Sequence, residues 1–191
     1  MDTRTNTAPR HERTWSSQNL NGLALLGVCL TLCIAFYYQF SLGELPCPLC
    51  LLQRVGLVLI GLGLVQNVCF GIRSAHYGMI LVGALTTGAI ALRQVLLHIT
   101  PGSGAYGSSF LGLHFYTWAA ITAVLTVLFV AGMLVLRSWE HPESQKINIL
   151  GKVATGIFVA IVAANLLSTL VECGFGQCDD NPTVYQWLSN H

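Results

Sequence analysis

Residues 51–70 read LLQRVGLVLIGLGLVQNVCF, an apolar run in which Arg54 is the only charged side chain. About 20 apolar residues are what an α-helix needs to cross a hydrocarbon core about 30 Å thick. The run is rich in leucine, valine and glycine, and small residues allow membrane helices to pack closely. This stretch therefore predicts a transmembrane helix.

Four other segments of similar length and composition flank it, at residues 20–40, 77–97, 115–136 and 149–171. They consist mainly of Leu, Ile, Val, Ala and Gly, with few interruptions. None has the alternating pattern of about ten residues that marks a strand of an outer-membrane barrel. The sequence therefore predicts an all-α integral membrane protein, a bundle of five transmembrane helices.

The composition supports this class of fold. Of the 191 residues, 53% are hydrophobic and only 9% are charged, and the mean hydropathy is +0.62. Soluble domains carry about 25% charged residues. The net charge of +1 argues against nucleic-acid binding, which needs a concentrated basic face. A chain of this length holds one compact membrane domain and little else.

Basic residues outside the predicted spans gather on one side of the membrane. The segments 1–19, 71–76 and 137–148 contain Arg4, Arg10, Arg13, Arg73, Arg137 and Lys146, and Lys152 lies just inside the fifth span on the same side. By the positive-inside rule this side is cytoplasmic. We expect residues 1–19 to form a cytoplasmic tail, 20–171 the transmembrane domain, and 172–191 a tail on the outer side. The first span is expected to remain as an anchor, because no small-residue cleavage site follows it.

Cys47-Pro48-Leu49-Cys50 stands between the first and second spans, where the chain leaves the membrane and re-enters it. A CxxC pair alone is a weak signal, since it also occurs in zinc half-sites and by coincidence. At a helix N-terminus, however, unpaired backbone N–H groups and the helix dipole stabilise a thiolate. Arg54 lies four residues after Cys50 on the same helical face, and it adds a fixed positive charge. The combination predicts a redox centre at the outer membrane surface.

The seven cysteines fall into two groups. Cys29, Cys33 and Cys69 lie within spans, where cysteine usually acts as a small buried hydrophobe. Two close pairs lie at the outer side, as expected in an oxidising compartment: Cys47 with Cys50, and Cys173 with Cys178. We interpret the C-terminal pair as a second exchanging dithiol, with a static disulfide as the main alternative. Zinc bound by all four is a weaker alternative, because the adjacent Arg54 disfavours a dication.

Two arginines lie within the predicted spans, Arg54 near the start of the second and Arg93 about one turn before the end of the third. Ionisable side chains in a bilayer are costly and are therefore candidates for function. The alternative is that each arginine extends to the interface and serves as an anchor.

The segment Pro46-Cys47-Pro48-Leu49-Cys50-Leu51-Leu52-Gln53-Arg54 resembles the signature of the DsbB family, bacterial inner-membrane proteins that pass electrons from thiols to quinone. Its place between the first and second spans matches as well. A second likeness lies in Ala91-Leu92-Arg93-Gln94-Val95-Leu96-Leu97-His98, which closes the third span before Pro101. The resemblance covers residues 20–118, about half of the chain.

The resemblance implies a route for electrons. In the family, ubiquinone or menaquinone from the quinone pool of the lipid membrane keeps the CxxC disulfide oxidised. A second cysteine pair exchanges disulfides with a soluble, DsbA-like thioredoxin-fold oxidase in the periplasm. Carried over, Cys50 is the thiolate beside the quinone, Cys47 is the link to the second pair, and Arg54 positions the quinone.

The second motif supplies further candidates for the quinone site. Gln94 and His98 are four residues apart, on one helical face at the depth of the CxxC. We expect them to hydrogen-bond the quinone carbonyl oxygens or to supply protons, with Arg93 as a further cofactor-binding candidate. The alternative for His98 is an interfacial side chain without a role in the site.

The position of the second cysteine pair departs from the family pattern. In the family it usually lies between the third and fourth helices, but residues 98–114 contain no cysteine. The chain has instead a fifth span that ends in Glu172-Cys173-Gly174-Phe175-Gly176-Gln177-Cys178, and it resembles five-helix relatives. The expected function is a quinone-dependent thiol oxidase of the bacterial inner membrane, with its redox cysteines on the periplasmic side. The alternatives are a reductive thiol transporter and a non-enzymatic membrane subunit with structural disulfides.

Overall fold

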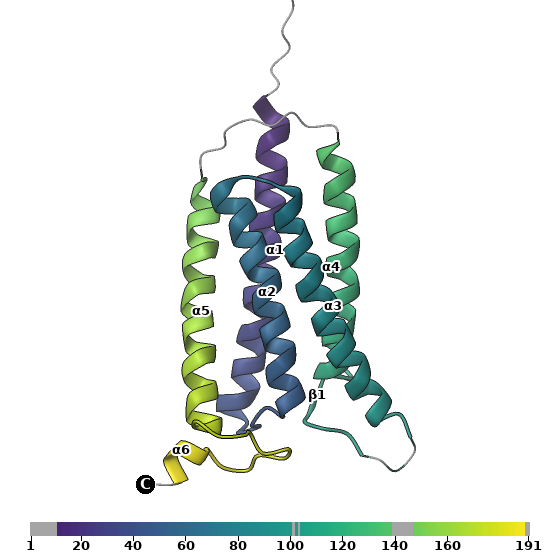
Figure 1. Ribbon diagram of the computed structural model, residues 1–191, viewed down its shortest axis with the longest axis vertical. Helices are drawn as coiled ribbons and strands as arrows, with labels where there is room; N and C mark the ends of the chain where they lie inside the picture. Colours follow the sequence, from purple (N-terminus) through teal and green to yellow (C-terminus); the bar gives the residue numbers. More distant parts are fainter. Residues whose placement is uncertain (1–10, 101, 103, 139–146, 190–191) are drawn as a thin grey trace, which may run out of the picture.

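The computed structural model describes residues 11–100, 102, 104–138 and 147–189. Within these residues, five long helices stand side by side along one axis (Figure 1). They are α1 His11–Ser41, α2 Pro48–Phe70, α3 Ser74–Leu97, α4 Phe115–Arg137 and α5 Ile149–Cys173. Each contains a stretch that is long and apolar enough to cross a membrane. The expected all-α bundle of spanning helices is confirmed.

The limits of the helices differ from the predicted spans, because an apolar window marks only the part inside the hydrocarbon. α1 begins at His11, and its candidate spanning part is Ser17–Ser41. α2 begins at Pro48 rather than at residue 51, since proline suits the first helical turn and the side chain of Cys47 caps that turn. α5 continues to Cys173, so the second cysteine pair begins within the helix.

The orientation of the bundle in the membrane stays a prediction. Arg4, Arg10 and Lys146, on which it partly rests, lie outside the described residues. Arg73 comes just before α3, and Arg137 closes α4 at the same end of the bundle, opposite the start of α2 (Figure 1).

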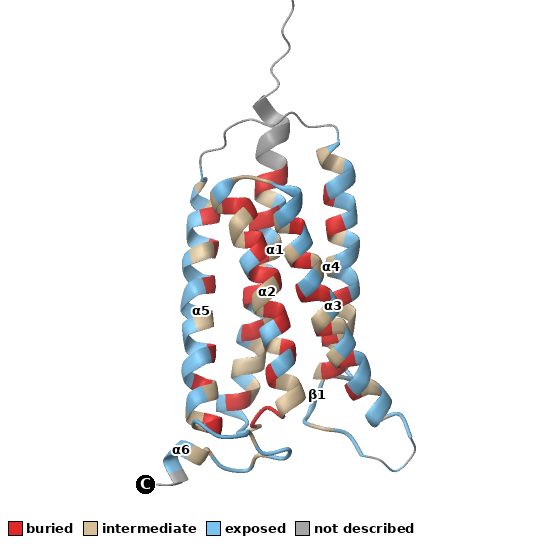
Figure 2. Cartoon of the chain, viewed as in Figure 1, coloured by how far each residue is buried: buried red, intermediate tan, exposed pale blue. Residues whose placement is uncertain are grey.

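α2 stands in the middle of the bundle, in contact with α1, α3 and α5, while α4 packs on α3. Glycines bring α2 and α3 together: a Cβ added at Gly83 would lie 2.7 Å from the backbone nitrogen of Ile60. Such close approach gives membrane helices the van der Waals contact that holds them together. Buried residues line the facing sides of the helices and exposed ones the outer sides (Figure 2). Leu30, Leu85 and Leu128 are among these outward side chains, as expected for a surface that faces lipid.

Buried polar side chains connect three helices at the end away from the CxxC. Asn67 of α2 donates from Nδ2 to Asn21 Oδ1 of α1 at 3.0 Å. Asn21 Nδ2 donates to the Tyr77 hydroxyl of α3 at 3.1 Å, and all three residues are buried. Interhelical hydrogen bonds in membranes contribute about 0.6 kcal/mol each on average. These bonds fix how α1, α2 and α3 sit against one another.

Shorter elements gather at the end where α2 begins and α5 ends, the lower end in Figure 1. The loop between α3 and α4 carries an antiparallel pair of strands, β1 Ser109–Phe110 and β2 Leu113–His114. The short helix α6, Gln186–Ser189, follows the second cysteine pair. The sequence did not predict these elements. The start of α2 and the end of α5 bring both cysteine pairs to one end of the bundle (Figure 1).

Candidate active site

Cys47 and Cys50 form a disulfide with their Cα atoms 5.0 Å apart. Cys47 is the N-cap of α2, and its sulfur accepts a hydrogen bond from the backbone N–H of Cys50 at 3.1 Å. Pro48 occupies the first turn, where its missing N–H costs nothing. Cys47 is 6% exposed, while Cys50 is half-buried. The helix dipole and the N–H group therefore act directly on the Cys47 sulfur, in the direction that favours a thiolate.

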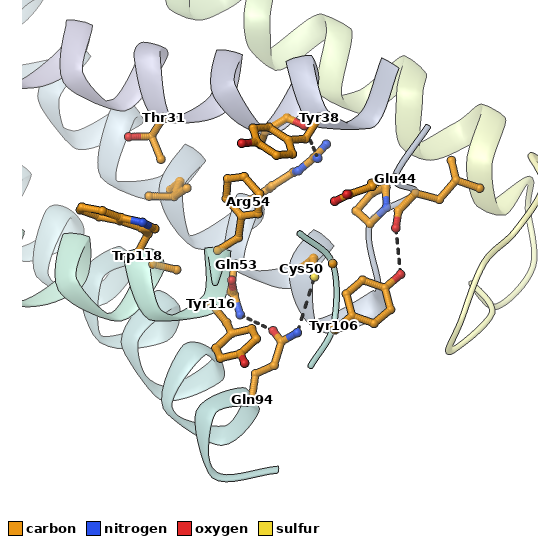
Figure 3. A pocket seen from close by; sticks show the side chains of 17 residues that line it. Thr31, Tyr38, Glu44, Cys50, Gln53, Arg54, Gln94, Tyr106, Tyr116 and Trp118 are labelled. Atoms are coloured by element: carbon orange, nitrogen blue, oxygen red, sulfur yellow. Dashed lines mark hydrogen bonds between the residues drawn. The ribbon is translucent and has the colours of Figure 1, made fainter. Parts of the chain in front are cut away.

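Gln94 reaches this disulfide from α3. Its Nε2 donates to Cys47 Sγ at 3.4 Å and to Cys50 Sγ at 3.7 Å. Its Oε1 accepts from Gln53 Nε2 at 2.8 Å. Gln53 thereby fixes which end of the Gln94 amide faces the sulfurs, as Figure 3 shows. When the disulfide is reduced, the same donor is placed to stabilise a thiolate, since hydrogen bonds to charged acceptors are the stronger ones.

The guanidinium group of Arg54 points away from Cys50, toward α1 (Figure 3). Nη1 donates to Gln39 Oε1 at 2.8 Å, and Nη2 donates to the Ala35 carbonyl at 3.4 Å. The guanidinium carbon lies 5.3 Å from the centre of the Phe36 ring, within the range of a cation–π contact. Arg54 is therefore held inside the bundle and does not extend to its end.

A cavity of about 110 Å³ lies between α1, the start of α2, α4 and the loop after α3. Its walls are mostly apolar and aromatic, with a few polar groups. The residues that bear on the chemistry are Cys50, Arg54 and Gln94, together with the aromatic Tyr38, Tyr116 and Trp118. The cavity thus brings together Cys50 and two of the four residues that the sequence predicts for cofactor binding.

Two loop segments close one side of the cavity. The Tyr106 hydroxyl donates to the Leu45 carbonyl at 2.8 Å, and the backbone N–H of Ser108 donates to Glu44 Oε2 at 3.1 Å. Burial raises the pKa of Tyr106 above its usual value, with smaller contributions from the negative charges of Glu172 and Glu44. Tyr106 therefore keeps its proton, and this hydrogen bond, at physiological pH.

His98 and Arg93 do not line the cavity. His98 is the C-cap of α3, and its Nδ1 lies 2.8 Å from the Gln94 carbonyl. Because a carbonyl only accepts, Nδ1 carries a proton in this contact. The imidazole stacks on Tyr116 with the ring centres 5.4 Å apart, so it lies behind a cavity wall. Arg93 is exposed on the outer side of α3.

Cys173 and Cys178 form a second disulfide, with their Cα atoms 4.6 Å apart. Cys173 is 4% exposed at the end of α5, and Cys178 is half-buried. Gly174 follows the helix with φ +61°, a left-handed conformation in which glycine carries no steric cost. This residue lets the chain reverse and return Cys178 to Cys173. Cys178 is the more accessible sulfur of the pair.

Sequence reasoning missed three polar residues behind Arg54. Gln39 Nε2 donates to Ser168 Oγ at 2.8 Å and to Glu172 Oε2 at 3.4 Å. All three side chains are buried. The available signal was their polarity within or beside apolar spans, where such residues are costly. Gln53, also missed as a site residue, carried the same signal.

The described residues contain no group of three or more His, Cys, Asp or Glu side chains that could hold a metal ion. The four cysteines proposed for the zinc alternative are joined in two disulfides instead.

The fold and the two disulfides describe a membrane protein suited to thiol–disulfide chemistry, and comparison with known proteins gives the family. The model of the family "Disulfide bond formation protein DsbB" matches residues 17–106. Disulfide bond formation protein B of Chromobacterium violaceum is 31% identical over 117 residues, 56% of this chain and 70% of that protein. The chain belongs to the DsbB family, whose members are oxidoreductases of disulfide bond formation.

Two further relatives share less of their length with this chain. Disulfide bond formation protein B of Marinobacter nauticus is 38% identical over 45% of this chain and 54% of that protein. The protein of the same name from Stutzerimonas stutzeri is 35% identical over 47% of this chain and 57% of that protein. The chain thus spans little more than half the length of these two relatives. No solved structure matches it. α5 and the second disulfide lie outside residues 17–106, where the family model matches.

Proposed function

We propose that this protein reoxidises a soluble thioredoxin-fold protein in the periplasm and passes the electrons to ubiquinone or menaquinone in the inner membrane. One observation carries the proposal. A disulfide at the N-terminus of a membrane helix borders a cavity that also contains an arginine and a glutamine from the helices around it.

The lining of the cavity suits a quinone ring. An apolar cavity of about 150 Å³ holds a benzene ring, so this one, of about 110 Å³, must widen on its open side to take a substituted quinone ring. Ligand sites are typically apolar and aromatic, with a few placed polar groups. Arg54 and Gln94 are the polar groups that would hold the ring, against Tyr116 and Trp118. A quinone bound there would supply the electron sink, taking two electrons and two protons as the Cys47–Cys50 disulfide re-forms.

Exchange with the soluble partner starts at the second disulfide. A thiolate of the partner attacks Cys178 Sγ, the Cys173–Cys178 bond breaks, and Cys173 leaves as a thiolate. The second thiolate of the partner then attacks the partner sulfur that is bonded to Cys178 and releases Cys178 as a thiolate. The partner is now oxidised, and two electrons reside on Cys173 and Cys178. The greater exposure of Cys178 supports this order of attack.

The electrons then move to the first pair. Cys178 attacks Cys47 Sγ, and Cys50 leaves as a thiolate at the cavity wall. Cys173 attacks Cys178 in turn, re-forms the second disulfide and releases Cys47. Because Cys47 is buried, this step needs a local opening of the segment before α2. Gln94 donates to the sulfur that carries the charge, while the positive charge of Arg54 lies farther along the cavity, toward α1.

Electron transfer to quinone is the test of this function. The purified protein is mixed with a small dithiol and a short-chain benzoquinone, and loss of the oxidised quinone absorbance is followed. We expect turnover in the wild type and none above background in a Cys47→Ala/Cys50→Ala variant. A wild type that behaves like this variant would contradict the proposal and favour cysteines with a structural role. Turnover that is driven only by an electron donor on the opposite side of the membrane would favour reductive transport instead.

A further inference from the structure

A chain of buried polar side chains runs from the cavity to the last turn of α5. Arg54 donates to Gln39 Oε1 at 2.8 Å, and Gln39 Nε2 donates to Ser168 Oγ at 2.8 Å and Glu172 Oε2 at 3.4 Å. Gln39 is 1% exposed and Glu172 is 2% exposed. The thiol exchange steps use none of Gln39, Ser168 and Glu172. Ser168 and Glu172 also lie outside the region matched by the family model.

The row of hydrogen bonds from Arg54 through Gln39 to Glu172 has a defined direction. The side-chain amide of Gln39 has one accepting end and one donating end, whereas an ionised carboxylate only accepts and a guanidinium only donates. Glu172 therefore requires the Gln39 NH₂ group on its side, and Arg54 requires the carbonyl oxygen on the other. Turning the amide over would put donor against donor at Arg54 and acceptor against acceptor at Glu172. Glu172 thus favours the same orientation of the Gln39 amide that Arg54 requires.

The same row of side chains places a negative charge, on Glu172, opposite the positive charge of Arg54. A positive charge within a membrane span is costly unless an opposite charge or strong acceptors accompany it. When Glu172 is ionised, its negative charge and the positive charge of Arg54 attract each other across Gln39. Glu172 Oε1 is buried and has no hydrogen-bond partner among the described residues. An unpaired buried acceptor costs stability, so stabilising α5 does not by itself explain a glutamate at this position.

We propose that Glu172 is a positioning residue for Arg54, and that through Gln39 it holds the guanidinium at the cavity wall where the quinone ring binds. The fifth helix then does two things, since it carries the second disulfide and also sets the arginine of the quinone site. This inference rests on the proposed function, because it needs a quinone in the cavity.

Quinone binding is measured directly, apart from turnover. Trp118 lines the cavity, so a short-chain benzoquinone bound there should quench its fluorescence, and a Trp118→Phe variant identifies that signal. We expect Glu172→Gln to raise both the dissociation constant and the quinone KM roughly tenfold, as for loss of one charge-assisted interaction. The value of kcat should change less than about twofold, because a uniform loss of binding raises KM alone.

Two further variants separate positioning from a structural role. Asp180→Asn removes a negative charge from an exposed residue at the same end of the bundle, and we expect wild-type binding. The double variant Gln39→Glu/Glu172→Gln moves the carboxylate one step closer to Arg54. The new carboxylate at position 39 accepts from Arg54, and the new amide at position 172 donates to that carboxylate. We expect the double variant to recover most of the binding that Glu172→Gln loses. Thermal unfolding and gel filtration show whether each variant is folded.

The outcomes are distinct. Wild-type protein that binds no quinone overturns the proposed function and this inference together. Wild-type binding in Glu172→Gln, with quenching intact in the wild type, overturns this inference alone. A Glu172→Gln variant that is weak and is not rescued by Gln39→Glu overturns it as well, since Glu172 would then act through the stability of α5.

Discussion

Gln94 contacts both sulfurs of the Cys47–Cys50 disulfide, and its amide is oriented by Gln53. Replacing it by leucine keeps the volume but removes the donor. We expect Gln94→Leu to destabilise the thiolate and so to lower the alkylation rate of the reduced pair at neutral pH by roughly fivefold. A hydrogen bond to a charged group contributes about 1.5 kcal/mol, and less where water partly replaces it. The rate is measured by treating the reduced protein with iodoacetamide and quantifying the alkylated peptide that carries both cysteines.

Gln53→Leu is the matched control for that substitution. It leaves the Gln94 donor in place and removes only the bond that orients it, so the alkylation rate should fall less than in Gln94→Leu. Equal rates in the wild type and Gln94→Leu would show that the helix N-terminus alone stabilises the thiolate.

Arg54 makes two directed hydrogen bonds and a stacking contact on α1. Lysine keeps the positive charge but cannot reproduce this planar arrangement. We expect Arg54→Lys to raise the quinone KM by roughly fivefold, about 1 kcal/mol of binding, with little change in thermal stability. Arg73→Lys, at the opposite end of the bundle, should leave the quinone KM unchanged. An unchanged quinone KM in Arg54→Lys would reduce Arg54 to an anchor.

At the scale of residues, spacing along one helix predicts what lies together on that helix. Cys47, Cys50 and Arg54 were proposed in this way, and so were Gln94 and His98; of the last two only Gln94 lines the cavity. The direct partners of Arg54 come from α1, and the bond that links Gln39 of α1 to Glu172 of α5 spans 133 positions in sequence. Such a contact depends on how helices pack, and one sequence does not determine that. The same holds for Arg93, whose exposure follows from the rotation of α3.

At the scale of elements, the contact between α2 and α3 depends on the absence of side chains. A Cβ at Gly83 would lie 2.7 Å from Ile60 N and 2.9 Å from the Gly56 carbonyl oxygen. Because these neighbours are backbone atoms, the helices must move apart. We expect Gly83→Ala to lower the free energy of unfolding by about 1–3 kcal/mol, as for overpacking elsewhere, measured by thermal or denaturant unfolding in detergent.

Gly78 on the same helix is the matched control, because a Cβ there meets nothing within 4 Å. Gly78→Ala should be neutral or stabilising by up to about 1 kcal/mol, as alanine is the better helix former. If both alanines had the same effect, helix propensity would explain the result and the close contact would not.

The helices themselves were predictable because a bilayer requires a minimum apolar length, and each segment meets it. The ends were less so. Cys47 caps α2 and moves its start to Pro48, and the polar first turns of α1 lie beyond any apolar window. The β1–β2 hairpin is only two residues per strand, too short to show an alternating pattern.

At the scale of the whole molecule, both disulfides lie at the end of the bundle opposite Arg73 and Arg137 (Figure 1). If the basic end is cytoplasmic, a membrane-impermeant thiol reagent added outside reduced cells should label Cys50 and Cys178, the more exposed members of the pairs. Labelling that requires permeabilised cells would reverse the orientation and contradict a periplasmic partner.

The unequal burial of Cys173 and Cys178 gives the most specific test of how the two disulfides work together. In a Cys173→Ser variant Cys178 is a free thiol, and its thiolate can attack Cys47 Sγ or the disulfide of the oxidised partner, while the thiol that would resolve the resulting mixed disulfide is missing. We expect this variant to accumulate a mixed disulfide with Cys47 or with the soluble partner. The species should be visible on a non-reducing gel and disappear when a reducing agent is added. Cys178→Ser leaves only the buried Cys173 and should accumulate less of it. Both variants should still reduce quinone with a small dithiol, because Cys47 and Cys50 are intact. A static disulfide at the C-terminus would instead make both variants equally less stable and trap no partner in either.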